Sequence, residues 1–235
     1  MAMMMVDAGG PSSYKKRKRS NSKGKGPAYS GPKLQDGSFY SRNARAYGMR
    51  SVVEPGYVDL AYANYDLNTT GSLVLLNTIG QGAGTSQRVG KRVALKSLQC
   101  RGNIQANDAA TSTDVAYMIV YDKRPTGVLP AITDILVTAS PRAFNNDTNS
   151  GRFRILKRVD EVLIGSAANQ YTCCSTKSAD WYLDLKGLPQ VFKAAGTGAI
   201  GDIEEGALYL VTVGAAAGTS AGTLGAGFRV RYIDV

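Results

Sequence analysis

Asp114-Val115-Ala116-Tyr117-Met118-Ile119-Val120-Tyr121-Asp122 is the stretch of sequence that decides the fold. It is almost continuously apolar between its two terminal aspartates, a pattern typical of a central strand that is buried on both faces. Pro125, Gly127 and Pro130 follow and force the chain into a long loop. Within that loop, the residues from Ile132 to Val137 predict one or two turns of helix.

The sequence on either side of this segment also has the patterns of strands. Val93–Ile104 alternates between apolar and polar residues, with a slip near Ser97 that predicts a β-bulge. Further strands are predicted at Tyr57–Tyr65, Ser72–Leu76, Arg152–Ile164, Trp181–Leu185, Gln190–Phe192, Ala207–Val213 and Phe228–Val235. Irregular loops and the lack of a sustained amphipathic helix predict an all-β protein with a single, roughly eight-stranded antiparallel β-sandwich. Because the loops are long and unequal, we expect a jelly roll rather than an up-and-down barrel.

The glycine-rich stretch Gly80–Arg92 resembles a phosphate-binding loop only at first sight. Five residues rather than four separate Gly84 from Gly90, and Arg92 occupies the position that requires Ser or Thr. We therefore interpret this stretch as a flexible loop.

Positive charge is concentrated at one end of the chain, which has 235 residues and a net charge of +10. Residues 1–50 contain eleven Lys and Arg and only two Asp, whereas residues 51–235 contain 17 basic and 16 acidic side chains. We predict a mostly disordered basic arm at 1–50 and one globular domain at 51–235, which is long enough to bury its own core. The asymmetry indicates a polyanionic partner.

Seven basic residues of the arm lie within eleven positions, without an acid among them: Lys15, Lys16, Arg17, Lys18, Arg19, Lys23 and Lys25. Their mutual repulsion, and the Ser, Gly and Asn between them, disfavour helix and strand. Such a run has two usual uses, which one segment can combine: a nuclear import signal, here at Lys15–Arg19, and sequence-independent binding of nucleic-acid phosphates. The alternative is a solubility tail or an expression remnant.

The other basic residues of the arm are Lys33, Arg42, Arg45 and Arg50. They are interleaved with aromatic residues, a composition that suits single-stranded nucleic acid, because cations contact phosphates while rings stack on unpaired bases. In the alternative interpretation, Tyr29, Phe39, Tyr40 and Tyr47 only anchor the arm to the surface of the globular domain.

One basic cluster lies outside the arm, at the start of the strand predicted at Arg152–Ile164. It consists of Arg152, Arg154, Lys157 and Arg158. Strand alternation is expected to place Arg152, Arg154 and Arg158 on one side, where their guanidinium groups would bind nucleic-acid phosphates. The alternative is a solvated face whose cations pair with local acids such as Asp160 and Glu161.

The composition argues against catalysis. The chain contains no histidine, the commonest general base and metal ligand. Carboxylates are paired only as sequence neighbours, Asp160-Glu161 and Glu204-Glu205, which point apart on a strand. Zinc spacing is missing among the cysteines, and no loop has the alternating Asp and Asn pattern of a calcium site. We expect no enzyme, no catalytic residue, no cofactor and no metal site.

Cys100, Cys173 and Cys174 are interpreted as small buried apolar residues, because an odd number with two adjacent members does not suit disulfides. No apolar run has the length of a membrane span, and the N-terminus lacks the pattern of a signal peptide. We therefore expect a cytosolic or nuclear protein without a membrane partner.

With the strands laid out, the chain resembles the capsid proteins of circular single-stranded DNA viruses that encode a replication initiator, above all those of geminiviruses and genomoviruses. The resemblance is carried by the basic arm, by Gln87–Leu98 leading to Arg101-Gly102, by Val120–Pro125 and by the closing strand Phe228–Asp234. These motifs cover most of residues 15–125 and the last strand, in the expected order.

The resemblance implies a jelly-roll shell domain and a homo-oligomeric icosahedral virion of about 60 copies or more. It also implies that the arm binds the viral single-stranded DNA genome and a host nuclear import receptor, which places the protein in the virion and in the host nucleus. Two alternatives share the arm and the β-sandwich: a capsid of a small RNA or satellite virus, and a nuclear nucleic-acid-binding β-sandwich protein. The turn Asp122–Pro125, in its place between two strands, favours the DNA-virus capsid.

Overall fold

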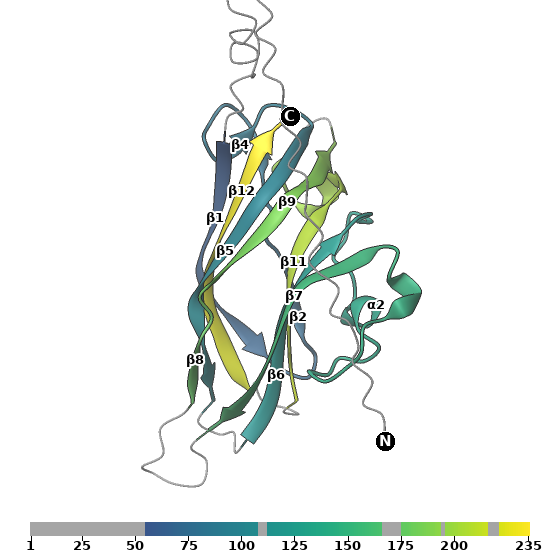
Figure 1. Ribbon diagram of the computed structural model, residues 1–235. Coiled ribbons are helices and arrows are strands. Elements are labelled where there is room, and N and C mark those ends of the chain that lie inside the picture. The colour runs from purple at the N-terminus through teal and green to yellow at the C-terminus, as the bar shows by residue number, and fades with distance from the viewer. Residues whose placement is uncertain (1–54, 108–111, 166–174, 194–195, 216–220) are drawn as a thin grey trace, which may run out of the picture. The chain divides into compact units, whose positions relative to one another are not determined.

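A computed structural model describes residues 55–107, 112–165, 175–193, 196–215 and 221–235. These residues form two antiparallel sheets that face each other (Figure 1). Helical elements within these ranges are short: α2 (Ile132–Ile135), η1 (Asp147–Asn149) and η2 (Ile200–Asp202). None of them has the length and apolar character needed to cross a membrane. The arm predicted at residues 1–50 lies outside the described residues.

The larger sheet has the order β1-β12-β5-β9-β10, with β8 paired to β5. Its strands are β1 (Pro55–Leu67), β5 (Arg92–Ala106), β8 (Thr176–Ser178), β9 (Trp181–Phe192), β10 (Ile203–Glu205) and β12 (Gly222–Asp234). The smaller sheet has the order β2-β11-β6-β7 and consists of β2 (Ser72–Leu75), β6 (Ser112–Asp122), β7 (Phe153–Ile164) and β11 (Ala207–Gly214). A separate parallel pair is formed by β3 (Gly80–Gln81) and β4 (Gln87–Arg88).

The order of the strands is that of a jelly roll. The first strand, β1, pairs with the last, β12, and β2 pairs with β11, so that each sheet joins segments from both ends of the described chain. This wrapping of a strand pair around the molecule gives the two facing sheets of a jelly roll. The predicted all-β class and jelly-roll architecture are confirmed. The count of eight is not, because the described residues form twelve strands, four of them only two or three residues long.

The strand β6 is buried on both faces, as its continuous apolar sequence predicts. From Val115 to Tyr121, every residue is at most 4% exposed. One face points to the larger sheet, where the Tyr117 hydroxyl accepts a hydrogen bond from Trp181 Nε1 at 2.9 Å. The other face is covered by the segment 123–152, in which Ile135 and Leu136 are buried. Figure 1 shows α2 beyond the smaller sheet, on the side away from the larger one.

The bulge predicted near Ser97 is confirmed at Lys96, which has no register partner while Leu95 and Ser97 do. The two strands predicted at Trp181–Leu185 and Gln190–Phe192 are wrong as separate elements, because they form the single strand β9. Lys186 (φ 53°) and Gly187 (φ 75°) adopt left-handed backbone opposite the bulge. The glycine therefore bends the strand instead of ending it.

Two stretches predicted as loops are partly strands. β12 begins at Gly222 rather than Phe228, and its glycines pair with β5 along the full ladder. The stretch Gly80–Arg92 contains β3 and β4, and the Arg88 side chain is fully buried with its guanidinium carbon 3.9 Å from the centre of the Phe192 ring. The glycine-rich composition indicated loop but gave no sign of this packed arginine.

Candidate nucleic-acid interface

The basic cluster predicted at Arg152–Arg158 lies at the start of β7, which pairs with β6. The register of the two strands shifts between Ile119 and Val120, so that Leu156 bulges out of the ladder. Arg154 pairs with Tyr121 and Arg158 with Met118, which lie on opposite faces of the regular strand β6. The prediction that the arginines share one side is therefore wrong, because one extra residue reverses the alternation.

Arg152 forms a two-pronged ion pair with Asp122. Its Nε and Nη2 donate to the two carboxylate oxygens at 3.0 and 2.8 Å. Asp122 is fully buried and also accepts a hydrogen bond from the backbone N–H of Arg124 at 3.0 Å. This hydrogen bond from Arg152 to the carboxylate raises the pKa of Arg152. The pair joins the end of β6 to the start of β7, so Arg152 stabilises the contact between these two strands.

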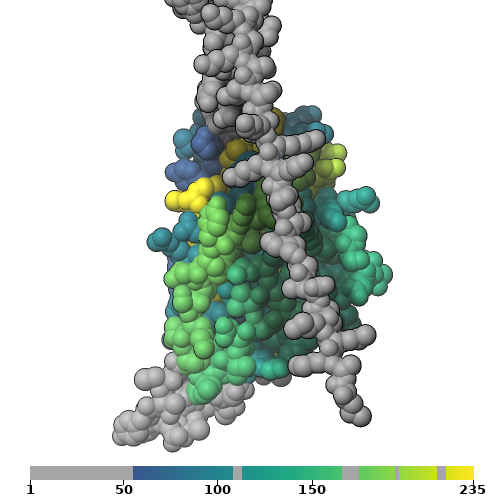
Figure 2. Space-filling model, viewed as in Figure 1, coloured from purple at the N-terminus to yellow at the C-terminus, as the bar shows by residue number. Residues whose placement is uncertain are grey.

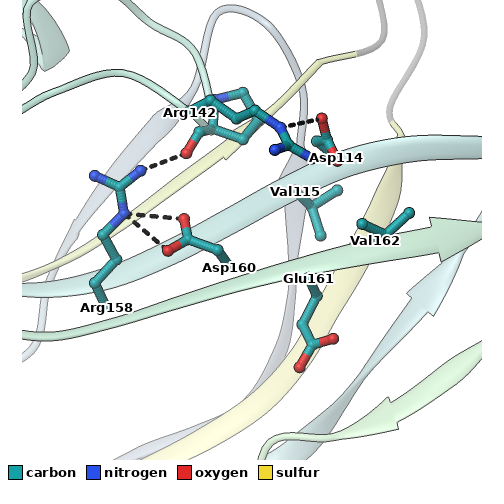
Figure 3. Close-up of a pocket in the computed structure, with 8 residues that line it drawn as sticks. Asp114, Val115, Arg142, Arg158, Asp160, Glu161 and Val162 are labelled. Carbon is teal, nitrogen blue, oxygen red and sulfur yellow. Dashed lines mark hydrogen bonds and ion pairs between the residues drawn. The ribbon is translucent and has the colours of Figure 1, made fainter.

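Arg158 fastens the segment 123–152 to β7. Its Nε donates to both carboxylate oxygens of Asp160, at 2.9 and 3.1 Å, and its Nη1 donates to the carbonyl of Ala143 at 2.9 Å. The Nη2 group donates to the carbonyl of Pro141. Figure 3 shows the contacts of Arg158 with Asp160 at one side of a hollow of about 360 Å³. The alternative interpretation of cations paired with local acids therefore describes Arg158 and Asp160 well.

A second ion pair lies at the same hollow. Arg142 donates to the Asp114 carboxylate from Nε at 2.6 Å and from Nη2 at 2.8 Å (Figure 3). The hydrogen bond from Arg142 lowers the pKa of Asp114. Glu161 points away from both pairs in Figure 3, as expected for a residue that alternates with Asp160. Because three acids and only two arginines line the hollow, it offers no net attraction to phosphate.

The two remaining cations of the cluster are less committed. Lys157 Nζ lies 5.3 Å from the centre of the Trp181 ring, at the edge between the sheets. The Arg154 side chain is exposed and has no hydrogen bond or ion pair with another described residue. Of the three arginines predicted to bind phosphate, Arg154 alone therefore keeps a free guanidinium among the described residues. The binding role of Arg152, Arg154 and Arg158 stays a prediction.

The basic residues of the arm lie outside the described residues, so their predicted contacts with nucleic acid stay predictions. They are Lys15, Lys16, Arg17, Lys18, Arg19, Lys23, Lys25, Lys33, Arg42, Arg45 and Arg50.

Groups with shifted pKa values are structural. Burial raises the pKa of Tyr117 and Tyr121 to about 12, and both hydroxyls are used in hydrogen bonds between the sheets, to Trp181 and to the carbonyl of Pro189. Burial likewise raises the pKa of Cys100 to about 12. Within the described ranges, no three His, Cys, Asp or Glu side chains come together as they would around a metal ion. Tyrosines and a thiol held neutral in this way serve packing.

Sequence reasoning missed two features that bear on the interface. The partner of Arg152, Asp122, is 30 residues away in the chain, and no local pattern connects them. The alternation of Val93–Ile104 predicted a strand, but the sequence gives no hint of which residues from other strands lie beside the polar side of β5.

Comparisons with known proteins agree with the fold and with the coat-protein interpretation. Residues 9–235 match the model of the geminivirus coat protein/nuclear export factor BR1 family. The capsid protein of Miscanthus streak virus (isolate 91) is 28% identical over 162 residues, covering 60% of this chain and 63% of that protein. The coat protein of Maize white line mosaic Satellite virus is 33% identical over 109 residues, covering 44% of this chain and 49% of that protein. The chain thus spans less than two thirds of the length of these curated relatives.

Two solved viral structures are among those that match this chain. Desmodium yellow mottle tymovirus matches with 14% identity and a TM-score of 0.29, over 78% of this chain and 86% of that one. The VP1 pentamer of Human Polyomavirus 6 matches with 11% identity and a TM-score of 0.31, over 78% and 95%. Because both TM-scores are below 0.5, the fold assignment rests on the strand order given above. The family match over residues 9–235 identifies the chain as a viral coat protein that belongs to the geminivirus coat protein/nuclear export factor BR1 family.

Proposed function

We propose that this coat protein assembles into an icosahedral shell and packages circular single-stranded DNA through the basic arm at residues 1–50. The division of charge carries the proposal, because eleven basic residues and two acids lie in the arm while residues 51–235 are almost neutral. A near-neutral domain with its own core can form a shell, and the arm can neutralise phosphates without sequence preference. The cargo places the protein in the virion and, during assembly, in the host nucleus.

Salt dependence follows from this division. Each phosphate contact on a single strand contributes about −0.7 to the slope of log affinity against log salt concentration. An arm that uses most of its eleven cations would therefore give a slope of about −5 to −8. The slope should hardly change between oligonucleotides of different sequence.

The cargo can be identified directly. Nucleic acid released from purified particles should be digested by DNase and should resist RNase. A variant with Gln at the seven basic positions of Lys15–Lys25 should assemble with far less cargo, whereas Ala at the neutral positions Ser20, Asn21 and Ser22 is the matched control. RNase-sensitive cargo would support the RNA or satellite-virus alternative, and normal packaging by the Gln variant would remove the arm from the proposal.

Self-assembly is supported by apolar side chains exposed on the segment 123–152. Val128, Leu129, Val137 and Phe144 are all exposed, and Phe144 is 85% exposed. Figure 2 shows this segment (teal) projecting from one edge of the body. Exposed apolar groups of this kind are typical of protein contacts. Phe144→Lys should leave the far-UV circular dichroism unchanged and reduce particle yield in sedimentation, and normal particles would show that this surface is not a subunit contact.

Nuclear import through Lys15–Arg19 is a separate part of the proposal, with a host import receptor as the partner. A basic run of this density is typical of an import signal. A fluorescent fusion with Ala at these five positions should lose nuclear accumulation, while the neutral-position variant of the same segment should keep it. If localisation does not change, phosphate binding is the only use of the run.

A further inference from the structure

The larger sheet has a polar and aromatic side that points away from the smaller sheet, and we call it the open face. The register places Asp59, Arg229, Gln99 and Tyr182 in one row across β1, β12, β5 and β9. Asn64, Gly225 and Asn103 form a second row on the same side. Residues that alternate with them, such as Cys100 and Phe228, are buried in the core. The open face is therefore the outer surface of the larger sheet.

Tyr62 lies flat on the open face. β1 bulges between Leu60 and Ala63, and Tyr62 falls within this bulge. Its hydroxyl donates to Asn103 Oδ1 at 3.0 Å, although Asn103 is on β5 and β12 lies between the two strands. Since strands are about 4.8 Å apart, the ring must cross β12 to make this bond.

Glycine makes this crossing possible. A Cβ atom at Gly225 would lie 2.0 Å from the Tyr62 hydroxyl oxygen, which is closer than any real contact. The ring therefore rests on the backbone of β12 with one face toward the sheet, while the side chain is 62% exposed. A phenol ring held flat by a terminal hydrogen bond presents its other face to solvent as a fixed stacking platform.

Arg101 and Tyr182 lie beside this platform. Arg101 pairs with Gly227 of β12, two positions from Asn103, and its exposed guanidinium makes no hydrogen bond or ion pair with another described residue. Tyr182 is 63% exposed. Between Arg101 and Tyr182 lies a hollow of about 410 Å³, which Gln99, Asp180 and Trp181 also line. Two exposed rings thus flank an unpaired cation and a shallow depression.

The acids near the open face decide which part of a nucleic acid would fit. Asp59 is neutralised by Arg229, with both N–O distances 2.6 Å. Asp180 lines the hollow, and its carboxylate is held in position by hydrogen bonds that it accepts from the Gly102 N–H and the Ser178 hydroxyl. A phosphate in the hollow would be repelled by this carboxylate, whereas an uncharged base would not. The hollow suits a base, and Arg101 at its edge suits the adjoining phosphate.

We propose that the open face, centred on Tyr62, Arg101 and Tyr182, binds the unpaired bases of single-stranded nucleic acid by stacking. This rests on the proposed function, that the chain packages a single-stranded genome. The arm would neutralise the phosphates, and the open face would provide a fixed surface that holds the bases. Exposed rings interleaved with cations on a sheet are the arrangement that accepts any base, because every base has a π-face.

A second copy of the chain could also bind to the open face, but the charged side chains of this face disfavour that contact. Four cations on or beside the open face, Lys96, Arg101, Lys186 and Arg231, form no salt bridge with a described residue, and they outnumber the acids there that form none, Asp66, Asp180 and Asp184. Lysine is depleted at protein interfaces, and cations that a partner does not pair lose their hydration there. Four exposed apolar side chains, Val128, Leu129, Val137 and Phe144, lie instead on the segment 123–152. A polyanion complements the open face better than this chain does.

The test compares two fluorescent 15-mers of equal charge, oligo(dT) and an abasic strand that has phosphates but no bases. Binding of the full chain is measured by anisotropy at about 0.5 M salt, where contacts of the arm with phosphate are weakened. The double variant Tyr62→Leu, Tyr182→Leu should bind oligo(dT) at least about tenfold more weakly. Its affinity for the abasic strand and its salt slope should stay unchanged.

Three variants make the result specific. Tyr62→Phe keeps the ring and should retain most of the affinity, and Arg101→Gln should reduce the salt slope by about 0.7. Phe144→Leu removes an exposed ring on the segment 123–152 and should leave the affinity for both strands unchanged. Circular dichroism checks the fold of each variant.

The failures can be told apart. If the wild-type chain binds neither strand even at about 0.1 M salt, the proposed function fails. If it binds both and the double variant loses nothing, or loses both strands equally, the stacking proposal is overturned while packaging by the arm stands. A double variant with unchanged affinity but altered sedimentation would make the open face a contact between copies, which also overturns the proposal.

Discussion

The outer faces of the two sheets use arginine in opposite ways. On the smaller sheet, the segment 123–152 covers the surface, and Arg158 is held by Asp160 and by two carbonyls of that segment. On the larger sheet no described segment covers the outer surface, and the Arg101 side chain has no partner among the described residues. Where a segment covers a sheet, a cation must be paired because burial of an unpaired charge is costly. Where the surface is open, the same side chain is available to a ligand.

The largest expected effect is a loss of stability at alkaline pH. It arises because buried groups ionise in the core that lies between the two faces. Cys100, Tyr117 and Tyr121 ionise near 9 to 10 in water, and burial raises their pKa values to about 12. Between these limits the folded chain holds protons that the unfolded chain releases, so stability is complete below about pH 9 and falls as pH rises. Ionisation of each group should lower the free energy of unfolding by about 2 kcal/mol or more at pH 12.

Thermal melting of unassembled protein from pH 8 to 11.5 measures this loss. Tyr117→Phe removes one of the ionising groups and should make the decline shallower. A melting temperature that does not change over this range would contradict the burial of these groups.

Breaking the ion pair at the covered sheet has the next largest effect. Asp122→Ala removes the buried partner of Arg152 and the acceptor for the Arg124 N–H. Loss of one member of a buried pair costs about 3 to 5 kcal/mol, and since the Arg152 side chain is 26% exposed we expect about 2 to 3 kcal/mol. Urea unfolding of unassembled protein measures the difference.

The matched control is Asp114→Ala, which breaks the exposed pair with Arg142 on the same sheet. Surface pairs contribute little, so its unfolding midpoint should not change measurably. Equal losses in the two variants would mean that burial does not distinguish these pairs.

Two glycines of the larger sheet, one on each side of it, test how closely its strands are packed. At Gly102 a Cβ atom would lie 2.1 Å from the carbonyl oxygen of Gly225 and 2.7 Å from Ala226 Cα, which are backbone atoms. Gly102→Ala must therefore displace β12 and should cost about 1 to 3 kcal/mol. At Gly225 the nearest atom is the Tyr62 hydroxyl oxygen, at the end of a side chain that can rotate.

Gly225→Ala should consequently fold with little loss of stability while it weakens binding to oligo(dT), because Tyr62 no longer lies flat. Urea unfolding measures the stability of the two variants, and anisotropy measures their binding to oligo(dT). Together the two measurements distinguish the effects of Gly102→Ala and Gly225→Ala. If Gly225→Ala destabilises the chain as much as Gly102→Ala does, the ring of Tyr62 is not free to move.

The sequence predicts whatever depends on neighbouring residues. The apolar run at Asp114–Asp122 was enough to predict a strand buried on both faces, and the phase slip near Ser97 was enough to predict a bulge. The bulge at Leu156 was not predicted, because Arg152, Arg154 and Arg158 follow the spacing of an unbroken strand.

Contacts between distant segments were out of reach for a different reason. The platform of Tyr62 depends on Asn103, 41 residues away, and on a glycine in the last strand. Nothing in the local sequence of β1 shows that a glycine will lie under this ring. Such a site needs the register of three strands, which only the assembled sheet supplies.

The substitution with the smallest expected effect on stability compares the outer faces of the two sheets most directly. Asp59 is exposed, and its hydrogen bond from Arg229 lowers its pKa, so its contribution to stability is present at neutral pH and is lost as pH falls through that lowered pKa. Because such a pair is solvated, Asp59→Asn should leave urea unfolding at pH 7 unchanged within error. The variant frees Arg229 on the open face, however, and one more cation available to phosphate should steepen the salt slope for oligo(dT) by about 0.7. Asp160→Asn is the control on the covered sheet: Arg158 remains held by the carbonyls of Pro141 and Ala143, so the slope should stay the same. Steeper slopes in both variants, or in neither, would show that the outer faces of the two sheets do not differ in their access to nucleic acid.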